Sequence, residues 1–228
     1  MKDFSLLEVL GPIMIGPSSS HTAGAARLGR MGSKIAGPNF YKVVFELHGS
    51  FAKTYAGHGT DKALLAGVMG FTPSDERIRD SYALAVESGL EFEFVEVDLG
   101  YVHPNTVRMQ FMYKDQETFY VQGSSIGGGN IIITDINGTE IEYRGERPTI
   151  IAKYVDKRGI LSKITSLFSI SGINIANMSV IRNRKIATLV CELEGEVDNS
   201  IVDDINRLYT FDFIKFISPG KEDDAYVQ

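Results

Sequence analysis

The C-terminal third of the chain alternates regularly between strand-like and helix-like hydrophobic patterns. Apolar residues recur at helical spacing from Ile160 to Phe168 and again from Ile201 to Tyr209. The resulting order, β-α-β-β-α-β, is that of a ferredoxin-like split unit. We therefore predict such a domain over residues 148–220. Its strands are the runs rich in β-branched or alternating apolar residues at 149–154, 173–181, 186–193 and 211–217.

The pattern before residue 147 is mixed. Thr60 and Ser74 are predicted to cap helices at 60–69 and 74–88, and a third helix is predicted at 22–35. The fold class expected for the whole chain is therefore α/β (α+β), with a mixed α/β domain at 1–147 and a charged tail at 221–228 after the second domain. Half-buried strands of the first domain are predicted at 41–47, 92–98, 107–113, 118–121, 131–135 and 140–143.

Composition narrows the functional class. The chain has 228 residues, 43% of them hydrophobic, which is typical of a folded protein of one or two domains. Its charge is 23 − 29 = −6, without the basic cluster that nucleic-acid binding requires. Apolar runs such as 131–133 fall far short of the ~20 residues that span a bilayer, and no signal peptide is evident, so we expect a cytoplasmic protein. The single cysteine, Cys191, excludes an intrachain disulfide and any site built from several thiolates of this chain.

Residues 16–24 (Gly-Pro-Ser-Ser-Ser-His-Thr-Ala-Gly) form the first candidate for chemistry. Three serines before a predicted helix offer hydroxyls, backbone N–H groups and the positive helix end to a carboxylate or phosphate. His21 adds a group that can change its protonation near neutral pH. The alternative is a serine-rich helix cap beside a solvent-facing histidine.

Three further segments carry polar groups on predicted loops. His58 lies between two glycines in residues 57–61 (Gly-His-Gly-Thr-Asp), where another molecule could approach closely, although a structural histidine is the alternative. Residues 103–105 (His-Pro-Asn) form a turn before a strand. Residues 123–130 (Gly-Ser-Ser-Ile-Gly-Gly-Gly-Asn) contain six glycine and serine residues, and could form either an anion-binding nest or a flexible hairpin.

The second predicted domain resembles the ACT domain, a small-ligand regulatory module of amino-acid metabolism. The resemblance rests on residues 156–161 (Asp-Lys-Arg-Gly-Ile-Leu) and 172–175 (Gly-Ile-Asn-Ile). It implies an amino-acid site between paired domains. Alternatively, the glycine only lets the helix pack close to the sheet, and the domain serves dimerisation or coupling. The residues that would line the site are Asp156, Arg158, Gly159, Asn174 and Ile175.

Together and in this order, the four motifs followed by an ACT-like segment resemble the β chain of bacterial iron–sulfur L-serine dehydratases. The resemblance covers nearly the whole chain up to Lys221. A related fold is the allosteric substrate-binding domain of type 1 D-3-phosphoglycerate dehydrogenases. The resemblance therefore implies that the first domain is related to that substrate-binding domain.

The resemblance also implies an activity. The family converts L-serine to pyruvate and ammonia, a lyase reaction of amino-acid metabolism and gluconeogenesis. It uses a [4Fe–4S] cluster whose cysteines lie on an α chain, and an open iron acts as a Lewis acid on the serine hydroxyl. This chain would then be the β subunit of a heterodimer, active only with its α chain and holding no metal itself.

Residue by residue, the resemblance gives each motif a role. His58 would border the reacting serine, supported by Thr60 and Asp61, while the base would be His58, His21 or a group of the α chain. His103 and Asn105 would complete the pocket at the chain interface. The residues that would grip the substrate carboxylate are Ser18, Ser19, Ser20, His21 and Thr22.

Two rival functions use the same residues differently. The chain could be a non-catalytic serine sensor in which both domains bind effector and no residue touches the reaction. It could also be a structural partner that only stabilises the α chain. The lack of a Gly-x-Gly-x-x-Gly signature after a strand argues against the dehydrogenase form of the sensor.

Overall fold

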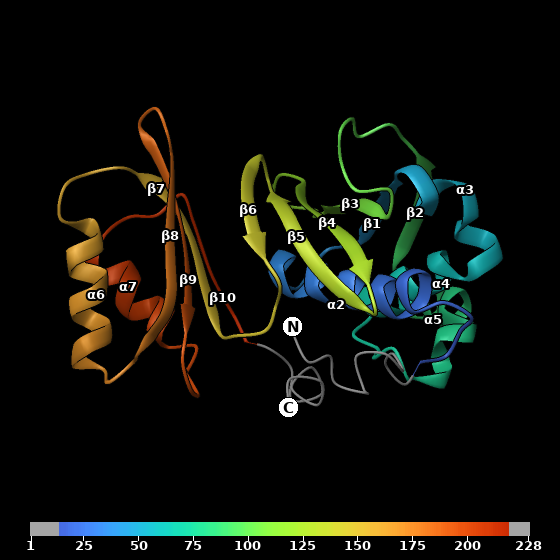
Figure 1. Ribbon diagram of the computed structural model, residues 1–228, viewed down its shortest axis with the longest axis horizontal. Helices are drawn as coiled ribbons and strands as arrows, with labels where there is room; N and C mark the ends of the chain where they lie inside the picture. The colour runs from blue at the N-terminus through green and yellow to red at the C-terminus, as the bar shows by residue number, and fades with distance from the viewer. Residues whose placement is uncertain (1–13, 219–228) are drawn as a thin grey trace, which may run out of the picture. The chain divides into compact units, whose positions relative to one another are not determined.

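The computed structural model describes residues 14–218, so residues 1–13 of the predicted first domain and the predicted tail 221–228 lie outside it. Contacts divide the chain into two compact units between Arg144 and Gly145, whereas the sequence predicted a boundary near residue 147. Each unit has its own sheet, with helices packed against it (Figure 1). The predicted mixed α/β class with a βαββαβ second domain is confirmed.

The first unit is built on a six-stranded sheet of order β2-β1-β3-β4-β5-β6. β1 and β2 are parallel, and the other neighbours are antiparallel. A parallel pair needs a crossover connection, which the helices between β1 and β2 supply. The strands are β1 (Lys42–Leu47), β2 (Glu91–Glu96), β3 (Thr106–Met112), β4 (Phe119–Gly127), β5 (Asn130–Ile136) and β6 (Thr139–Tyr143).

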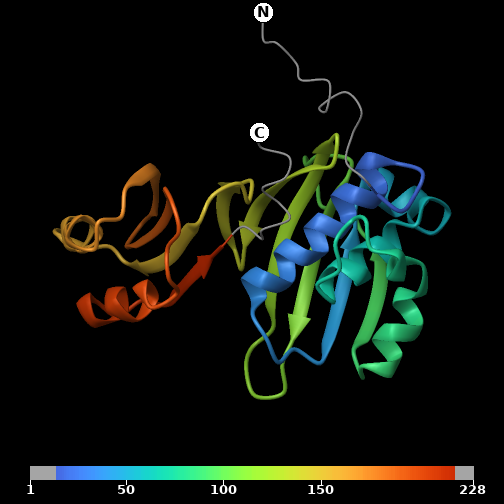
Figure 2. The ribbon, with the colours of Figure 1, turned by 90° about the horizontal axis from the view of Figure 1, so that it is seen from below.

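Helices cover one face of this sheet. Helix α2 lies across the strands in Figure 2, and it packs most extensively on β4 and on helix α4. Alternate residues of β1 and β3, among them Phe45 and Met109, are fully buried on the covered face. The helical elements are η1 (Ser19–Ala23), α2 (Gly24–Ala36), α3 (Gly49–His58), α4 (Thr60–Val68), η2 (Glu76–Asp80) and α5 (Ser81–Glu87).

Helices α2 and α4 approach each other closely because each presents a glycine at the crossing. A Cβ placed on Gly29 would lie 2.1 Å from the Leu64 carbonyl oxygen, and one on Gly67 would lie 2.1 Å from the Ala26 carbonyl oxygen. Backbone therefore meets backbone at this crossing. The two helices carry the serine–histidine motif and the Thr-Asp pair at their N-terminal ends, so the contact sets the relative position of these motifs.

Three local predictions for the first unit were wrong. Residues 49–58 form helix α3, which was not predicted. Much of segment 123–130, predicted as a loop, belongs to β4. Thr60 is the first residue of α4 and follows its cap, Gly59, while Asp75 and not Ser74 caps the next helical segment, through a bond from the Arg77 N–H.

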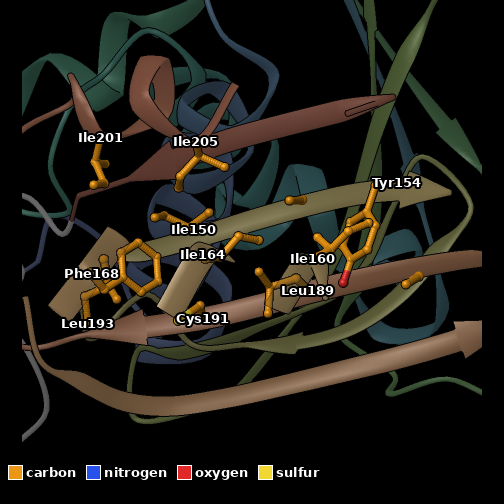
Figure 3. Close-up of a cluster of buried hydrophobic side chains, with 12 residues drawn as sticks. Ile150, Tyr154, Ile160, Ile164, Phe168, Leu189, Cys191, Leu193, Ile201 and Ile205 are labelled. Atoms are coloured by element: carbon orange, nitrogen blue, oxygen red, sulfur yellow. The ribbon is translucent and has the colours of Figure 1, made fainter. Parts of the chain in front are cut away.

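The second unit has the predicted order of elements. Its four-stranded sheet has the order β10-β7-β9-β8 and is antiparallel throughout. Phe168 and Ile164 of α6 and Ile205 of α7 pack on the strands in a single apolar core, as Figure 3 shows. The elements are β7 (Thr149–Val155), α6 (Ile160–Ile170), β8 (Ile175–Asn183), β9 (Ile186–Leu193), α7 (Ile201–Leu208) and β10 (Phe213–Ile217).

Within residues 14–218, none of the helices combines the length and the apolar character needed to cross a membrane.

Candidate functional site

Most of the predicted motifs meet at one edge of the six-stranded sheet. Strands β1 and β2 end at this edge, at Leu47 and Glu96, and β3 begins there at Thr106. Thr106 pairs with Ser124, which places the serine-rich part of β4 at the same edge. The N-terminus of α3 and the loop 97–105 complete the edge, because each directly follows a strand that ends there.

The serine–histidine motif forms the entry to helix α2. Its first turn, η1, is π-helical, and the Ser18 Oγ caps it by accepting a bond from the backbone N–H of His21 at 3.2 Å. Ser19 and Ser20 are half-buried in this turn. The buried Thr22 donates from its Oγ1 to a carbonyl of α3 at 3.5 Å. The motif is thus a helix N-terminus, as predicted, and it is bonded to α3.

The imidazole of His21 is held between two hydroxyl groups. Its Nδ1 lies 3.4 Å from the Ser18 Oγ, and its Nε2 lies 3.1 Å from the Ser50 Oγ at the start of α3. The rings of Phe51 and His58 lie edge-on to it, with centroids at 5.5 and 5.2 Å. Burial, and then the neighbouring His58, hold the pKa of His21 below its usual range. His21 is therefore neutral at pH 7 and can accept a proton.

His58 is exposed where helix α3 ends. It is the last residue of that helix, and Gly59 then turns the chain into α4 with φ +70°. A Cβ on Gly59 would meet no atom within 4 Å, so glycine is needed there for its backbone angle and not for space. The predicted Gly-His-Gly loop is therefore a one-residue junction between two helices. Its histidine faces solvent next to His21.

Thr60 and Asp61 lie inside the protein. Asp61 is 6% exposed, and its carboxylate accepts a bond from the Lys62 N–H at 2.8 Å and another from the Tyr82 hydroxyl at 2.5 Å. Burial, reinforced by the Asp61 carboxylate, raises the pKa of Tyr82. The fully buried Thr60 Oγ1 has no hydrogen-bond partner within the described residues. The Asp61 carboxylate therefore already has two hydrogen-bond donors within the protein. Contact of Thr60 and Asp61 with the substrate stays a prediction.

The loop that contains residues 103–105 fastens helix α3 to strand β4. The Pro104 carbonyl accepts bonds from the N–H groups of Ser50 and Phe51 at 2.7 and 3.4 Å. The Asn105 carbonyl accepts a bond from the Ser125 N–H at 3.0 Å. The exposed His103 accepts the Asn105 N–H at its Nδ1, at 3.1 Å. The backbone of this motif is therefore structural, while the His103 side chain lies at the surface.

The glycine–serine segment is a strand that lies directly under helix α2. A Cβ on Gly24 would lie 2.1 Å from the buried Ser125 Oγ, so only glycine allows this approach. Ser124 and Thr106 share a hydroxyl–hydroxyl bond of 2.7 Å. The glycines that follow turn the chain into β5, and the Gly129 carbonyl accepts a bond from Arg27 at 2.8 Å. Of the two predicted forms, this segment takes the hairpin.

Sequence reasoning gave no role to three side chains that contact the predicted site residues: Ser50, which it singled out only as part of His48-Gly49-Ser50, and Phe51 and Tyr82. Ser50 follows a strand and a glycine in the triplet His48-Gly49-Ser50, which is a typical helix-start signal. His48 has a structural role, since its Nδ1 accepts the Leu99 N–H at 3.2 Å. No signal in the sequence points to Tyr82, because its contact with Asp61 depends on how α5 packs on α4.

Whether this chain could hold a metal depends on how its His, Cys, Asp and Glu side chains are grouped. Within residues 14–218, no cluster of three or more His, Cys, Asp or Glu side chains could hold a metal ion. Cys191 is buried in the core of the second unit, where desolvation and then Glu192 raise the pKa of its thiol to about 12. A protonated, buried thiol is a poor iron ligand. The described residues therefore do not fit an iron–sulfur cluster.

The predicted ACT-site residues lie at opposite ends of the second sheet. Asp156 follows β7 and accepts a bond from Arg182, near the end of β8, at 2.8 Å. Asn174, before the start of β8, bonds Glu194 at 2.5 Å. Ile175 is half-buried and Arg158 is exposed. The two loops of one copy therefore cannot enclose one small ligand.

Gly159 begins helix α6 with φ +86°, and a Cβ there would meet no atom within 4 Å. The alternative explanation, that this glycine allows close packing of the helix on the sheet, is therefore wrong.

Comparison with known proteins gives consistent matches. The model of the family described as Serine dehydratase beta chain matches residues 5–93, and that of the ACT domain matches residues 149–208. The chain is 44% identical over 220 residues to the L-serine dehydratase, beta chain, of Peptoniphilus asaccharolyticus, covering 95% of this chain and 99% of that one. It is 38% identical over 210 residues to the probable L-serine dehydratase, beta chain, of Bacillus subtilis (strain 168), covering 91% and 95%. It is 27% identical over 201 residues to L-serine dehydratase TdcG of Escherichia coli (strain K12), covering 75% of this chain and 42% of that protein.

Proposed function

Because this chain belongs to the family of L-serine dehydratase β chains, we propose that it forms the serine-binding half of an L-serine ammonia-lyase. The reaction is the elimination that converts L-serine to pyruvate and ammonia. The observation that carries the proposal is the meeting of Ser18, His21 and His58 at one sheet edge, beside the N-termini of η1 and α3. These elements supply the two things that the elimination needs from this chain, a grip on a carboxylate and a neutral imidazole.

The N-terminus of η1 is the part suited to the substrate carboxylate. Free N–H groups and the positive end of a helix favour an anion, and the hydroxyls of Ser19 and Ser20 lie in the same turn. His21 stands behind this turn as a neutral imidazole, and the exposed His58 stands beside it. A serine bound by its carboxylate here would present its α-carbon to this pair of histidines. Either one is then a candidate for the base that takes the α-proton.

We assign the cofactor to a partner, the α chain. The described residues do not fit a [4Fe–4S] cluster, so we assign the cluster to an α chain. The β-chain names of the similar proteins support a two-chain enzyme, as does the match to less than half of a longer L-serine dehydratase. A cytoplasmic location accords with such an oxygen-sensitive cofactor.

The loop between β2 and β3 is the surface that we assign to the α chain. It projects from the sheet at the edge that holds the site (Figure 1). Its Tyr101 side chain is fully exposed, although the backbone around it is fixed by bonds from Gly100 N–H to Asp98 and from Val102 N–H to the Gly100 carbonyl, both 2.9 Å. An exposed aromatic residue on a fixed loop is typical of an interface anchor. A chain docked there would cover the substrate site.

We assign the ACT unit to pairing with a second copy. Its two candidate loops lie at opposite ends of one sheet, so an amino-acid site that uses both needs two copies placed head to tail. Ligand binding by the ACT unit thus requires pairing of two copies. Pairing without a ligand is the simpler role.

The test is to express the chain with the α chain from the same genome, purify the complex without oxygen and measure pyruvate. We expect serine-dependent activity from the complex and none from the isolated chain. In the complex, H58A should lower turnover severely, while K53A, an exposed change on the same helix, should leave it unchanged. Pyruvate formation by the isolated chain, or normal turnover in H58A, would contradict the proposal. Tight binding of L-serine to the isolated chain, with no activity from the complex, would identify a sensor instead.

A further inference from the structure

Ser50 stands out because it bonds a candidate catalytic histidine across a long separation in sequence. His21 and Ser50 are 29 residues apart, and the Nε2–Oγ distance is 3.1 Å. The bond joins the serine–histidine motif to helix α3, the helix that ends at His58. Whatever fixes Ser50 therefore also fixes the orientation of the His21 ring.

The backbone around Ser50 is held so that its hydroxyl is free to reach His21. In the first turn of a helix a serine hydroxyl usually competes for an unpaired N–H group. Here the Pro104 carbonyl already accepts the N–H of Ser50 and that of Phe51. Gly49 allows this approach, since a Cβ on it would lie 2.7 Å from the Pro104 oxygen. The Ser50 side chain can therefore bond the imidazole instead of its own helix.

The bonds at Nδ1 indicate which nitrogen of His21 carries the proton. The Ser18 Oγ accepts the backbone N–H of His21 at 3.2 Å and lies 3.4 Å from Nδ1, so its hydroxyl proton is in reach of that nitrogen, and we take it as the donor there. A neutral imidazole that accepts at Nδ1 carries its proton on Nε2. That proton then faces the Ser50 oxygen, which accepts it.

We propose that Ser50 is a positioning residue that holds His21 as the neutral Nε2–H tautomer, with Nδ1 turned toward the serine-rich turn. The importance of this positioning for the reaction rests on the proposed function. Among the described residues, the titratable group in contact with the ring is His58, and the other neighbours, Ser18, Ser50 and Phe51, do not titrate near neutral pH. The orientation of His21 is thus set by hydroxyl groups from two elements and not by a carboxylate.

The experiment is a long-range ¹H–¹⁵N NMR titration of the full chain, with the His21 signals assigned by comparison with H21N. We expect the wild-type ring to carry its proton on Nε2. In S50A the preference for this tautomer should be lost, and the pKa of His21 should fall further, because the charged ring loses an acceptor. S50T, which keeps the hydroxyl, should behave like the wild type. So should T54V, because the Thr54 hydroxyl donates to the Ser50 carbonyl, at 2.8 Å, and its loss leaves the Ser50 hydroxyl in place.

The outcomes separate this inference from the proposed function. The positioning role would be overturned by a wild-type ring protonated on Nδ1, or by an unchanged tautomer in S50A. If S50A does not fold, the wild-type tautomer alone decides. In the complex with the α chain, S50A should lower kcat by about 10- to 100-fold with little change in KM, and S50T should recover it. If the NMR result is as expected but the wild-type complex forms no pyruvate, the proposed function fails and the positioning role stands.

Discussion

Replacing Gly29 by alanine should force helices α2 and α4 apart. The added Cβ would lie 2.1 Å from the Leu64 carbonyl oxygen, whereas ordinary contact begins at 3.4 Å, so the gap must widen by 3.4 − 2.1 = 1.3 Å. The opposing atom is backbone, and the Val68 nitrogen lies only 2.9 Å away, so no side chain can turn aside to make room. The whole of one helix must move.

The free energy of unfolding should fall by about 2 kcal/mol. Alanine is favoured over glycine in a helix by about 1 kcal/mol, and this gain opposes the clash. Overpacking of a close-packed interior costs about 1–3 kcal/mol or more, and a backbone shift above 1 Å belongs at the upper end. The net loss corresponds to a Tm lower by about 4–8 °C for a unit of this size.

Two further helical glycines provide matched controls. A Cβ on Gly57, in the last turn of α3, meets no atom within 4 Å, so G57A should raise stability by up to about 1 kcal/mol. A Cβ on Gly32 meets the flexible end of Met109 at 2.5 Å, so G32A should fall between the other two variants.

Urea unfolding followed by circular dichroism would give the order of stability, and hydrogen exchange would locate the change. Protection should drop in α2 and α4 and stay unchanged in the second unit, which is a compact unit with its own apolar core. A G29A chain as stable as G32A would refute the reasoning from backbone contact. Turnover of the complex should fall as well, because the N-terminal ends of both helices carry site residues.

Three other changes test the site directly. The pKa of His21 in the folded chain lies below its unfolded value of about 6.5, so between these two pKa values the unfolded chain binds more protons than the folded one. The free energy of unfolding should therefore decline as the pH falls through 6.5 toward the folded pKa. Urea midpoints measured at about pH 7.5 and 5.5 should show this decline, and H21N should make it smaller. Y82F should lower the free energy of unfolding by about 1–2 kcal/mol in the same assay, since it removes a hydrogen-bond donor from the buried Asp61 carboxylate. An unchanged urea midpoint would contradict the importance of that bond. Y101S should weaken binding of the α chain at least about tenfold by calorimetry, while V86S, which also replaces an exposed hydrophobic side chain by serine but on α5, should not. Equal affinities of wild type and Y101S would remove Tyr101 from the interface.

The second unit could be predicted because its hydrophobic periods agree with its structure. The apolar residues from Ile160 to Phe168 form the buried face of α6, and the β-branched runs became strands with bounds close to those expected. No distant contact had to override a local preference there. The sequence pattern alone was therefore sufficient to predict it.

Strand β4 and helix α3 show why the first unit was harder. Gly123, Ser124 and Ser125 have low strand propensity, yet only small residues fit below α2, since a Cβ on Gly123 would lie 2.8 Å from Leu28. Helix α3 contains two glycines and has only two buried residues, so it shows no clear helical period. In both elements, contacts that are distant in sequence decided the structure.

The candidate site was predicted in part for the same reason. The motifs around His21 and His58 could be recognised from their composition, and the structure brings their rings to 5.2 Å. The Ser50 contact and the burial of Asp61 against Tyr82 depend on how helices pack, and no local pattern encodes them. Sequence thus indicated which motifs matter, and tertiary packing decided which atoms meet.

The bond between the Pro104 carbonyl and the start of α3 also has a consequence for the order of synthesis. Pro104 leaves the ribosome after α3, α4 and both parallel strands have been made. Until then the first N–H groups of α3 lack this acceptor, and the start of α3 is without the backbone bonds that fix Ser50 beside His21. A nascent chain that ends with β2 would contain both histidines but not the acceptor that fixes the start of α3.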